Sequence, residues 1–321
     1  MTDRAPVSYV LPMRWTSNDG LVELAGYLHG LSRLVDQVIV VDGSAPELMR
    51  AHRSAFAGAV CLMPPDPWPG GNGKVAGVMT GVRAAVHDLV ILADDDVRYG
   101  ARELSEVVSR LADVDLVRPQ NVFIELPWHA RWDTGRSLLN RALAADYPGT
   151  FGVRRSALLA AGGYSGDVLF ENLELIRTIR AARGRDVIAD DIFVPRRPPS
   201  TAHFLAQRVR QAYDDFAQPG RLILELALLP SCLCALRRPA IGVALAAVVV
   251  SIAERGRRRH GGRTHYSRWA ALWALPWVAE RSVCVWLALA ARVRGGVRYA
   301  GSRLFDAAHS EAAIRRRLVS T

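Results

Sequence analysis

Short apolar runs alternate with longer amphipathic stretches over the first hundred residues of the chain. The short runs are rich in β-branched side chains and predict buried strands at Val7–Leu11, Gln37–Val41, Ala59–Met63 and Leu89–Ala93. The stretches between them have helical periodicity and predict helices at Leu21–Leu34, Ala45–Phe56 and Lys74–Val86. Strands that alternate with helices indicate an α/β fold with a mostly parallel sheet flanked by helices.

Polar residues follow three of the four predicted strands. They are Pro12-Met13-Arg14, Asp42-Gly43-Ser44 and Asp94-Asp95-Asp96. Parallel sheets bind ligands where loops leave the carboxyl ends of their strands, so these residues are the first candidates for a site. Three adjacent carboxylates repel one another, and a hard divalent cation would relieve that repulsion. A solvated turn is the alternative interpretation, and the triplet alone leaves both open.

The composition changes in the last third of the chain. A helical stretch that follows Arg197-Pro198-Pro199 is expected to end near Ala217, before Pro219-Gly220. Apolar runs come next, at Leu222–Leu236, Ala240–Ala253 and Trp269–Ala291. The first two are shorter than the roughly 20 residues that cross a bilayer, so a tight membrane hairpin, interfacial helices and a packed helical subdomain all stay open. Tryptophans and flanking arginines favour a membrane interface.

The net charge of the chain supports this interpretation. All 40 arginines and one lysine stand against 31 acidic residues, for a net charge of +10. Residues 1–221 have a net charge of −1, and residues 222–321 have +11. A basic cluster beside apolar segments favours an anionic membrane surface and argues against nucleic acid. The N-terminus lacks the features of a signal peptide, so we expect the N-terminal part and the arginine loop at 254–263 to face the cytoplasm. The four cysteines have no disulfide or zinc spacing.

Several motifs, in their order along the chain, resemble family 2 glycosyltransferases, which have the GT-A fold, a Rossmann-like α/β fold. VILADDDV resembles the aspartate motif that ends the central strand of that family. YVLPMRW and QVIVVDGSAPE resemble its first two strands, and GNGKVAGVMTGVRAA resembles its Gly-Lys helix start. Downstream, GTFGVRRSALLAAGGYSGDVLFENLEL resembles the acceptor-side segment, and QRVRQAYDDF is similar to the Gln-x-x-Arg-Trp motif of membrane-associated members. The resemblance covers roughly residues 7–216.

This resemblance implies an enzyme that transfers a hexosyl or related group from a nucleotide sugar, with inversion and with Mg²⁺ or Mn²⁺. The metal ligands would be Asp94 and Asp96. Donor-binding residues would be Pro12, Arg14, Asp42, Lys74, Asp94, Asp95, Gln207 and Arg210. The apolar, basic C-terminal region suggests a lipid-linked or envelope glycan acceptor. We therefore expect a catalytic domain at 1–221 and a membrane-associated helical region at 222–321.

The catalytic base is the position where the chain departs from the family. An inverting transfer needs a carboxylate that takes the proton of the acceptor hydroxyl. The family has Glu-Asp here with aspartate as the base, whereas this chain has Asn172 in place of that aspartate. Glu171 is the first candidate and Glu174 is the second. Gln211 also stands where the last motif has tryptophan.

Lys74 is the only lysine in the chain, within the stretch GGNGKVAGVMTG. The spacing excludes a nucleoside-triphosphatase phosphate loop, because Trp68 stands at the first glycine position and Val75 follows the lysine. It also differs from the GxGxxG spacing of a dinucleotide site. An ammonium is a compact point charge that would fit beside the aspartate cluster where a planar guanidinium would not. A compositional accident is the alternative.

Two further functions stay open. Asn172 and the missing tryptophan are compatible with a catalytically impaired, membrane-bound protein that binds nucleotide sugars. A nucleotidyltransferase of similar fold is the second possibility, although its glycine-rich signature is missing from the first loop, which reads Pro12-Met13-Arg14-Trp15.

Overall fold

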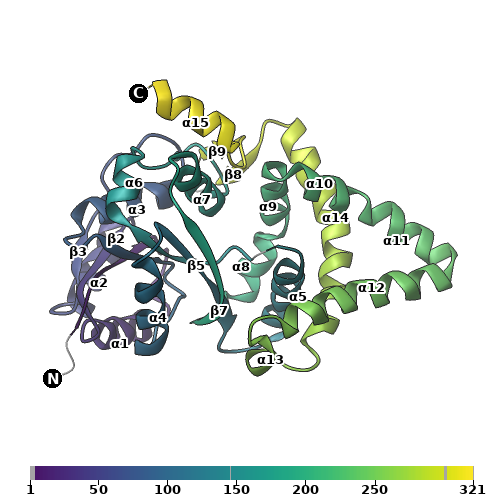
Figure 1. Cartoon of the computed structure of the whole chain (residues 1–321), viewed down its shortest axis with the longest axis horizontal. Coiled ribbons are helices and arrows are strands. Elements are labelled where there is room, and N and C mark those ends of the chain that lie inside the picture. Colours follow the sequence, from purple (N-terminus) through teal and green to yellow (C-terminus); the bar gives the residue numbers. More distant parts are fainter. Residues whose placement is uncertain (1–3, 145, 300–301, 321) are drawn as a thin grey trace. The chain divides into compact units, whose positions relative to one another are not determined.

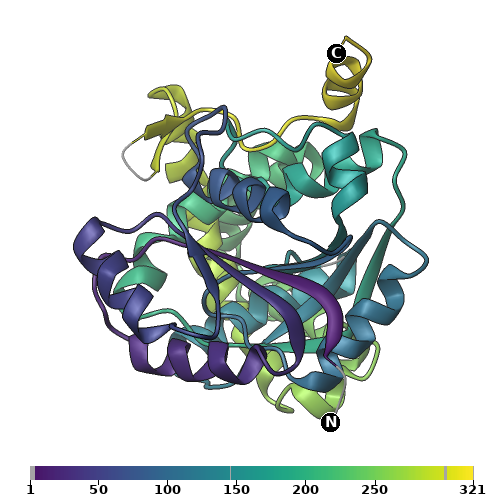
Figure 2. The same ribbon diagram turned by 90° about the vertical axis from the view of Figure 1, so that its left-hand side faces the viewer.

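The computed structural model describes residues 4–144, 146–299 and 302–320. The chain forms two compact units, each assembled from separate segments (Figures 1 and 2). The first unit comprises residues 1–121, 148–194 and 309–321, and the second comprises 122–147 and 195–308. Residues 1–3 of the N-terminal stretch considered above lie outside the described residues. The boundary at residue 221 between a catalytic and a membrane-associated region stays a prediction about function.

A seven-stranded sheet forms the centre of the first unit, and its strand order is β3-β2-β1-β4-β6-β5-β7. The strands are β1 (Ala5–Met13), β2 (Val35–Asp42), β3 (Cys61–Met63), β4 (Leu89–Ala93), β5 (Leu116–Phe123), β6 (Thr150–Arg154) and β7 (Asp186–Arg196). Strands β3, β2, β1 and β4 are parallel neighbours, and β6 is antiparallel to both β4 and β5. The four strands that the apolar runs predict are β1 to β4. The expected α/β class with a mostly parallel sheet is confirmed.

Helices cover both faces of this sheet, which explains why its central strands are apolar without strict alternation (Figure 2). The helices of the first unit are α1 (Leu21–Leu31), α2 (Pro46–Ala55), α3 (Gly73–Ala84), α4 (Ala101–Leu111), α6 (Arg155–Ala160), α7 (Glu171–Ala181) and α15 (Glu311–Ser320). In β1, Tyr9 belongs to one buried core together with Leu24 and Leu28 of α1. Val10 points to the opposite face, toward Gly81 of α3. The three helices predicted before β4 are α1, α2 and α3.

The second unit is mainly helical. Its elements are α5 (Trp128–Leu143), α8 (Thr201–Ala206), α9 (Arg208–Tyr213), η1 (Asp214–Ala217), α10 (Pro219–Leu226), α11 (Leu228–Arg237), α12 (Pro239–Arg258), α13 (Gly262–His265), η2 (Ala270–Trp273), α14 (Ala274–Val293), β8 (Val297–Tyr299) and β9 (Ser302–Leu304). The helix expected up to Ala217 is therefore three short helices. The expected break at Pro219 is real, and Pro219 begins the next helix, where its missing N–H costs nothing.

Three helical segments in the described residues are long and apolar enough to cross a membrane: Pro219–Arg237, Pro239–Arg258 and Ala270–Val293. They contain 19, 20 and 24 residues. The expectation that the first two segments are too short was wrong, because the helices continue through the charged residues that bound the apolar runs. Within the second unit, 39% of the last segment's apolar window is buried, against 6% and 11% for the other two.

Gly81 tests how closely α3 packs on the sheet. A Cβ atom there would lie 2.3 Å from Cγ1 of Val10, a stiff β-branched side chain in β1. We expect Gly81→Ala to lower the free energy of unfolding by about 1–3 kcal/mol, because the core has no room for a methyl group. Gly26→Ala is the matched control, since Gly26 is exposed in α1 with no atom within 4 Å of the added Cβ. At Gly26 the same change should raise the free energy of unfolding by up to about 1 kcal/mol, because alanine has the higher helix propensity. Urea denaturation of both variants measures the difference, and equal effects would contradict the close packing.

Candidate active site

Several of the candidate residues lie at the carboxyl ends of the parallel strands. The last residue of β1, Met13, pairs with Asp42 at the end of β2. Asp94 follows the last residue of β4 directly and donates its backbone N–H to Gly149 O at 2.8 Å. A Cβ on Gly149 would lie 2.6 Å from Oδ2 of Asp94, so a side chain at this position would displace the carboxylate. The sheet thus positions Asp94 before any ligand binds.

Lys74 lies between two carboxylates that come from distant parts of the sequence. Its Nζ is 2.6 Å from Oδ1 of Asp94 and 2.9 Å from Oε1 of Glu171. The lysine side chain is 24% exposed. Burial alone would lower the pKa of the ammonium, but the two carboxylates hold that pKa well above its usual value. The interpretation that Lys74 lies beside the aspartate cluster agrees with this geometry.

Asn72 fixes the start of the helix that carries Lys74. Its Oδ1 accepts the backbone N–H of Lys74 at 3.1 Å, as an N-cap residue does. Its Nδ2 donates to Val168 O at 3.0 Å, and its backbone N–H donates to Gly166 O at 2.8 Å. The same side chain therefore joins α3 to the loop that leads into α7. An asparagine before a predicted helix is a capping signal, and it could have identified Asn72 from the sequence.

Glu171 begins α7 and is 8% exposed. The next residue, Asn172, donates its Nδ2 to Pro148 O at 3.0 Å. A small cavity opens among these groups, with walls that include Pro12, Lys74, Asp94, Gly149, Tyr164 and Asn172. The structure of the first unit therefore brings together the predicted metal ligand, the predicted donor lysine and the first candidate base.

The other two aspartates of the triplet differ in their surroundings. Asp95 accepts a hydrogen bond from Nε1 of Trp15. Burial and the neighbouring charge of Asp96 raise the pKa of Asp95 to about 6, against the lowering effect of that hydrogen bond. Asp96 is half-buried at the same turn. In the residues that the structure describes, no group of three or more His, Cys, Asp or Glu side chains could hold a metal.

This donor set fits a hard cation only in part. The carboxylate oxygens of Asp94 and Asp96 are the ligand type that Mg²⁺ and Mn²⁺ take. Two carboxylates leave most of an octahedral shell to donor phosphates and water, which is the usual arrangement at phosphate sites. The ammonium of Lys74 already neutralises one oxygen of Asp94.

Asp42 is fully buried, and both of its oxygens bond to protein groups. Oδ1 accepts the backbone N–H of Ser44 at 2.9 Å, and Oδ2 lies 2.7 Å from Nδ1 of His52. Ser44 Oγ accepts the backbone N–H of Trp15 at 2.8 Å. Asp42 therefore organises the loop after β1 in this structure, and its direct contact with a donor stays a prediction. Pro12 lines the small cavity, and Arg14 is exposed.

Glu174, the second candidate base, is 1% exposed and bonds to the C-terminal segment. Its Oε2 accepts the backbone N–H of His309 at 2.8 Å, and its Oε1 lies 2.8 Å from Nδ1 of the same residue. Arg177 Nη1 donates to His309 O at 2.8 Å. Glu174 is therefore a buried carboxylate with two bonds to one residue of the C-terminal segment. No sequence signal connects residues 135 positions apart, so His309 could not have been found from the pattern.

Gln207 and Arg210 belong to the second unit. Gln207 is the junction between α8 and α9, so the two residues do not share the one helical stretch that was expected up to Ala217. They still line one cavity, where the side chain of Gln207 bonds to His203 and the guanidinium of Arg210 stacks over Tyr299 at 4.6 Å.

The comparisons with known proteins agree with this fold. Residues 28–122 match the family described as Glycosyl transferase family 21. Mannosyltransferase PcManGT from Pyrobaculum calidifontis, solved in complex with GDP-Man and Mn²⁺, has a TM-score of 0.55 and 20% identity over 90% of this chain and 88% of that chain. A mycobacterial protein and mannosyl-3-phosphoglycerate synthase from Rubrobacter xylanophilus each have a TM-score of 0.43. Their identities are 18% and 15%, over 62% and 63% of this chain and 70% of each of theirs. Among curated proteins none matches.

The contact between Glu174 and His309 gives a prediction about stability. We expect His309→Ala to lower the free energy of unfolding by about 2 kcal/mol, because a buried carboxylate loses one of its partners. Arg316→Ala, an exposed change on α15, is the matched control and should have little effect. In a Glu174→Leu background the His309→Ala change should cost much less, because the carboxylate is gone. Thermal denaturation measures the single and double variants. If the effects of Glu174→Leu and His309→Ala are additive, the proposed pairing of Glu174 with His309 is contradicted.

Proposed function

We propose that this chain, which is a glycosyltransferase of the GT-A type, transfers a sugar from a nucleotide-sugar donor to a hydroxyl group of a lipid-linked or envelope glycan, with inversion and with Mg²⁺ or Mn²⁺. The observation that carries the proposal is the Lys74 ammonium between Asp94 and Glu171 at the carboxyl ends of the parallel strands. Candidate residues for donor binding and for proton transfer there lie within one ion-pair network.

The leaving group of such a transfer is a nucleoside diphosphate whose negative charge grows in the transition state. Asp94 and Asp96 would hold the cation, which supplies Lewis-acid stabilisation of the diphosphate when it is bound. Lys74 adds a fixed positive charge at the same edge of the sheet. Asp42 acts as a positioning residue, because its bonds to Ser44 and His52 hold the loop that contains Trp15.

Glu171 is the group that we assign as the base. It is the first residue of α7, and Lys74 Nζ at 2.9 Å fixes the orientation of its carboxylate. Asn172 cannot accept a proton in place of the family's aspartate, and its amide donates to Pro148 O. Glu174 is less suited, because both of its oxygens bond to His309. Glu171 would take the proton of the acceptor hydroxyl as that oxygen attacks the donor sugar.

The membrane surface is part of the proposal. Helices α11 and α12 form a hairpin within the second unit (Figure 1). Large apolar side chains on this hairpin are exposed, among them Leu233, Leu236, Val243 and Val248. Exposed apolar area on this scale marks an interaction surface, and the neighbouring arginines favour anionic lipid. We assign the cytoplasmic side of the membrane to the catalytic residues.

Donor binding gives the first test. The full-length chain should be stabilised by about 2.7 kcal/mol when a true donor and Mn²⁺ are present at 100 times the Kd. GDP-mannose is the first donor to try, because the PcManGT structure contains GDP-Man and Mn²⁺. Asp96→Ala should lose the Mn²⁺-dependent part of this shift in thermal denaturation. No stabilisation by any nucleotide sugar, or an equal response of Asp96→Ala, would contradict the site.

Turnover separates the enzyme from the alternative of an impaired binding protein, which Asn172 favours. We expect Glu171→Gln to lower kcat by about 10²–10⁴-fold and to leave donor binding in place. Lys74→Arg should lower kcat/KM by at least about tenfold, because a planar guanidinium does not replace a point charge between two carboxylates. Steady-state assays that follow the release of the nucleoside diphosphate measure kcat and kcat/KM of both variants. An unchanged rate in Lys74→Arg would mean that the lone lysine is compositional, and no transfer by the native chain would favour the binding protein.

Membrane binding is tested in the full-length chain, because deletion of residues 222–321 would also remove α15 from the first unit. The double variant Leu233→Glu with Val243→Glu should lower cosedimentation with anionic vesicles at least tenfold, since each charge is costly in hydrocarbon. Val22→Glu with Val86→Glu is the matched control at exposed apolar positions of the first unit. Equal losses in both double variants would contradict the assignment to the hairpin.

A further inference from the structure

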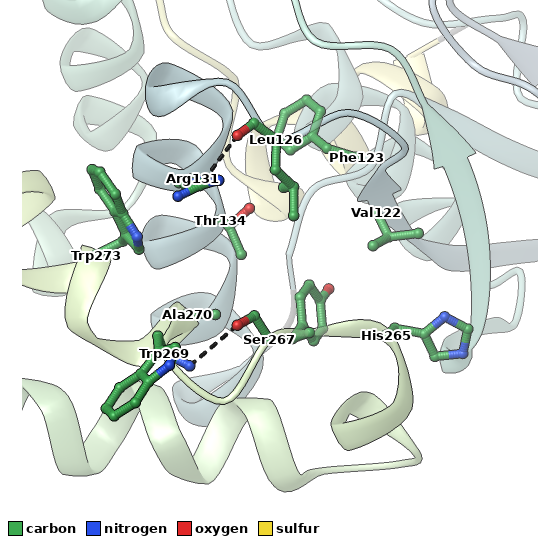
Figure 3. Close-up of a pocket in the computed structure, with 11 residues that line it drawn as sticks. Val122, Phe123, Leu126, Arg131, Thr134, His265, Ser267, Trp269, Ala270 and Trp273 are labelled. Atoms are coloured by element: carbon green, nitrogen blue, oxygen red, sulfur yellow. Dashed lines mark hydrogen bonds between the residues drawn. The ribbon is translucent and has the colours of Figure 1, made fainter.

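A cavity of about 260 Å³ lies within the second unit, between the start of α5 and the segment that leads into α14 (Figure 3). Leu126, Phe123 and Val122 lie on one side of it, and Ser267 and Ala270 lie on the other (Figure 3). Its walls are mostly apolar and aromatic, and they also include Arg131, Thr134, His265, Tyr266, Trp269 and Trp273. None of the candidate residues for sugar transfer lines this cavity.

Two polar side chains of the wall, those of Arg131 and Thr134, bond to backbone carbonyl groups. The Nε of Arg131 donates to Leu126 O at 2.8 Å, as the dashed line in Figure 3 shows. The hydroxyl of Thr134 donates to Ala130 O at 2.8 Å. A polar ligand would have to compete with these bonds, whereas an apolar ligand would leave them intact. The cavity therefore suits a hydrocarbon group.

The wall of the cavity is also the start of a candidate membrane span. Ala270 and Trp273 line the cavity and belong to the segment Ala270–Val293. Trp269, just before this segment, lines the cavity and is 60% exposed. Tryptophan is enriched where a helix meets the membrane–water interface. A hydrocarbon chain in the bilayer could thus enter along the same apolar surface.

Basic side chains lie in the cavity wall and in the segment of the chain that contains Trp269. The guanidinium of Arg268 lies over the ring of Trp269, 5.0 Å from its centroid. Arg263 belongs to the short helix α13 and is exposed, and Arg131 lies in the cavity wall. An amphiphile with an apolar chain and an anionic head group is complementary to both features.

We propose that this cavity binds the hydrocarbon chain of an anionic membrane lipid. The proposal rests on the membrane association included in the proposed function, and it adds a defined lipid site to it. A seated chain would anchor the second unit through a bound lipid in addition to the exposed hairpin of α11 and α12. The lipid comes from the bilayer itself, and no covalent step is involved.

Photocrosslinking of the full-length chain tests the site. The probe is a phosphatidylglycerol with a diazirine near the end of one acyl chain, mixed into phosphatidylcholine vesicles, with labelled peptides identified by mass spectrometry. We expect labelled peptides from residues 122–134 as well as from residues 228–258. The first segment lies outside every candidate span, so label there reports the cavity. Label in the second segment reports general contact with the bilayer.

Two substitutions fill the cavity from opposite sides. Ala270→Phe and Thr134→Leu should each lower the label on 122–134 at least fivefold and leave the label on 228–258 unchanged. Leu272→Phe is the matched control, because Leu272 is exposed on the same turn and does not line the cavity. It should label as the native chain does. Retained label on 228–258 also verifies that the variants are folded and bound.

Each other outcome has a distinct meaning. Label confined to 228–258 would overturn the lipid site and leave membrane association intact. No label on either segment would contradict the membrane association of the proposed function. Equal labelling of 122–134 by a diazirine phosphatidylcholine would overturn the preference for an anionic head group. Label on 122–134 that survives both cavity-filling changes would overturn the assignment to this cavity.

Discussion

The first unit depends on one ammonium group that holds together three segments of the chain. Lys74 comes from the start of α3, Asp94 from the end of β4, and Glu171 from the start of α7. Without a positive charge between them, the two carboxylates would repel each other in a half-buried site. The three elements meet there because Asn72 both caps α3 and bonds to the loop before α7. A guanidinium directs its donors within one plane, whereas an ammonium is a compact charge, and here it lies 2.6 Å and 2.9 Å from the two carboxylates. This is the physical reason that we propose for one lysine in a chain that otherwise uses arginine, and Lys74→Arg decides between it and a compositional accident.

Local patterns predicted the parts of the fold that local physics decides. Four apolar runs gave β1 to β4, since each run is short, β-branched and bounded by turn residues. The aspartates lie directly after β4 because charged residues are costly inside a buried strand and are placed where the chain leaves the sheet. The partners of these residues were beyond prediction. Asp42 bonds to His52, and Glu174 bonds to His309 across 135 positions, so only the folded chain brings these groups together. The helix expected up to Ala217 is interrupted at Gln207, and the next residue, Arg208, is buried and donates to Asp133 from a distant part of the sequence.

Ion pairs also explain why the apolar runs underestimated the helices of the second unit. Each apolar run ends at a charged residue, but the helix continues past it because the charged side chains there are paired. Arg221 lies 2.8 Å from Asp215, and Glu254 bonds to Arg257 and Arg258. In α14, the fully buried Arg281 donates to Asp215 at 2.9 Å. A charge buried in this way must keep its partner, so α14 has one face fixed within the unit.

This difference in burial distinguishes α14 from the other two apolar segments. Arg281 and its partners hold one face of α14 inside the second unit, and the short helix η2 that precedes α14 contributes Ala270 and Trp273 to the wall of the cavity. Helices α11 and α12 have no such buried pair between Leu228 and Val250 in the described residues, and none of their residues there is fully buried. The hairpin therefore has the composition of an element that enters lipid, and α14 has that of an element that the protein and lipid share. A single bound lipid chain between η2 and the start of α5 would then extend the protein core, since it would cover apolar wall that the helices of the second unit leave open.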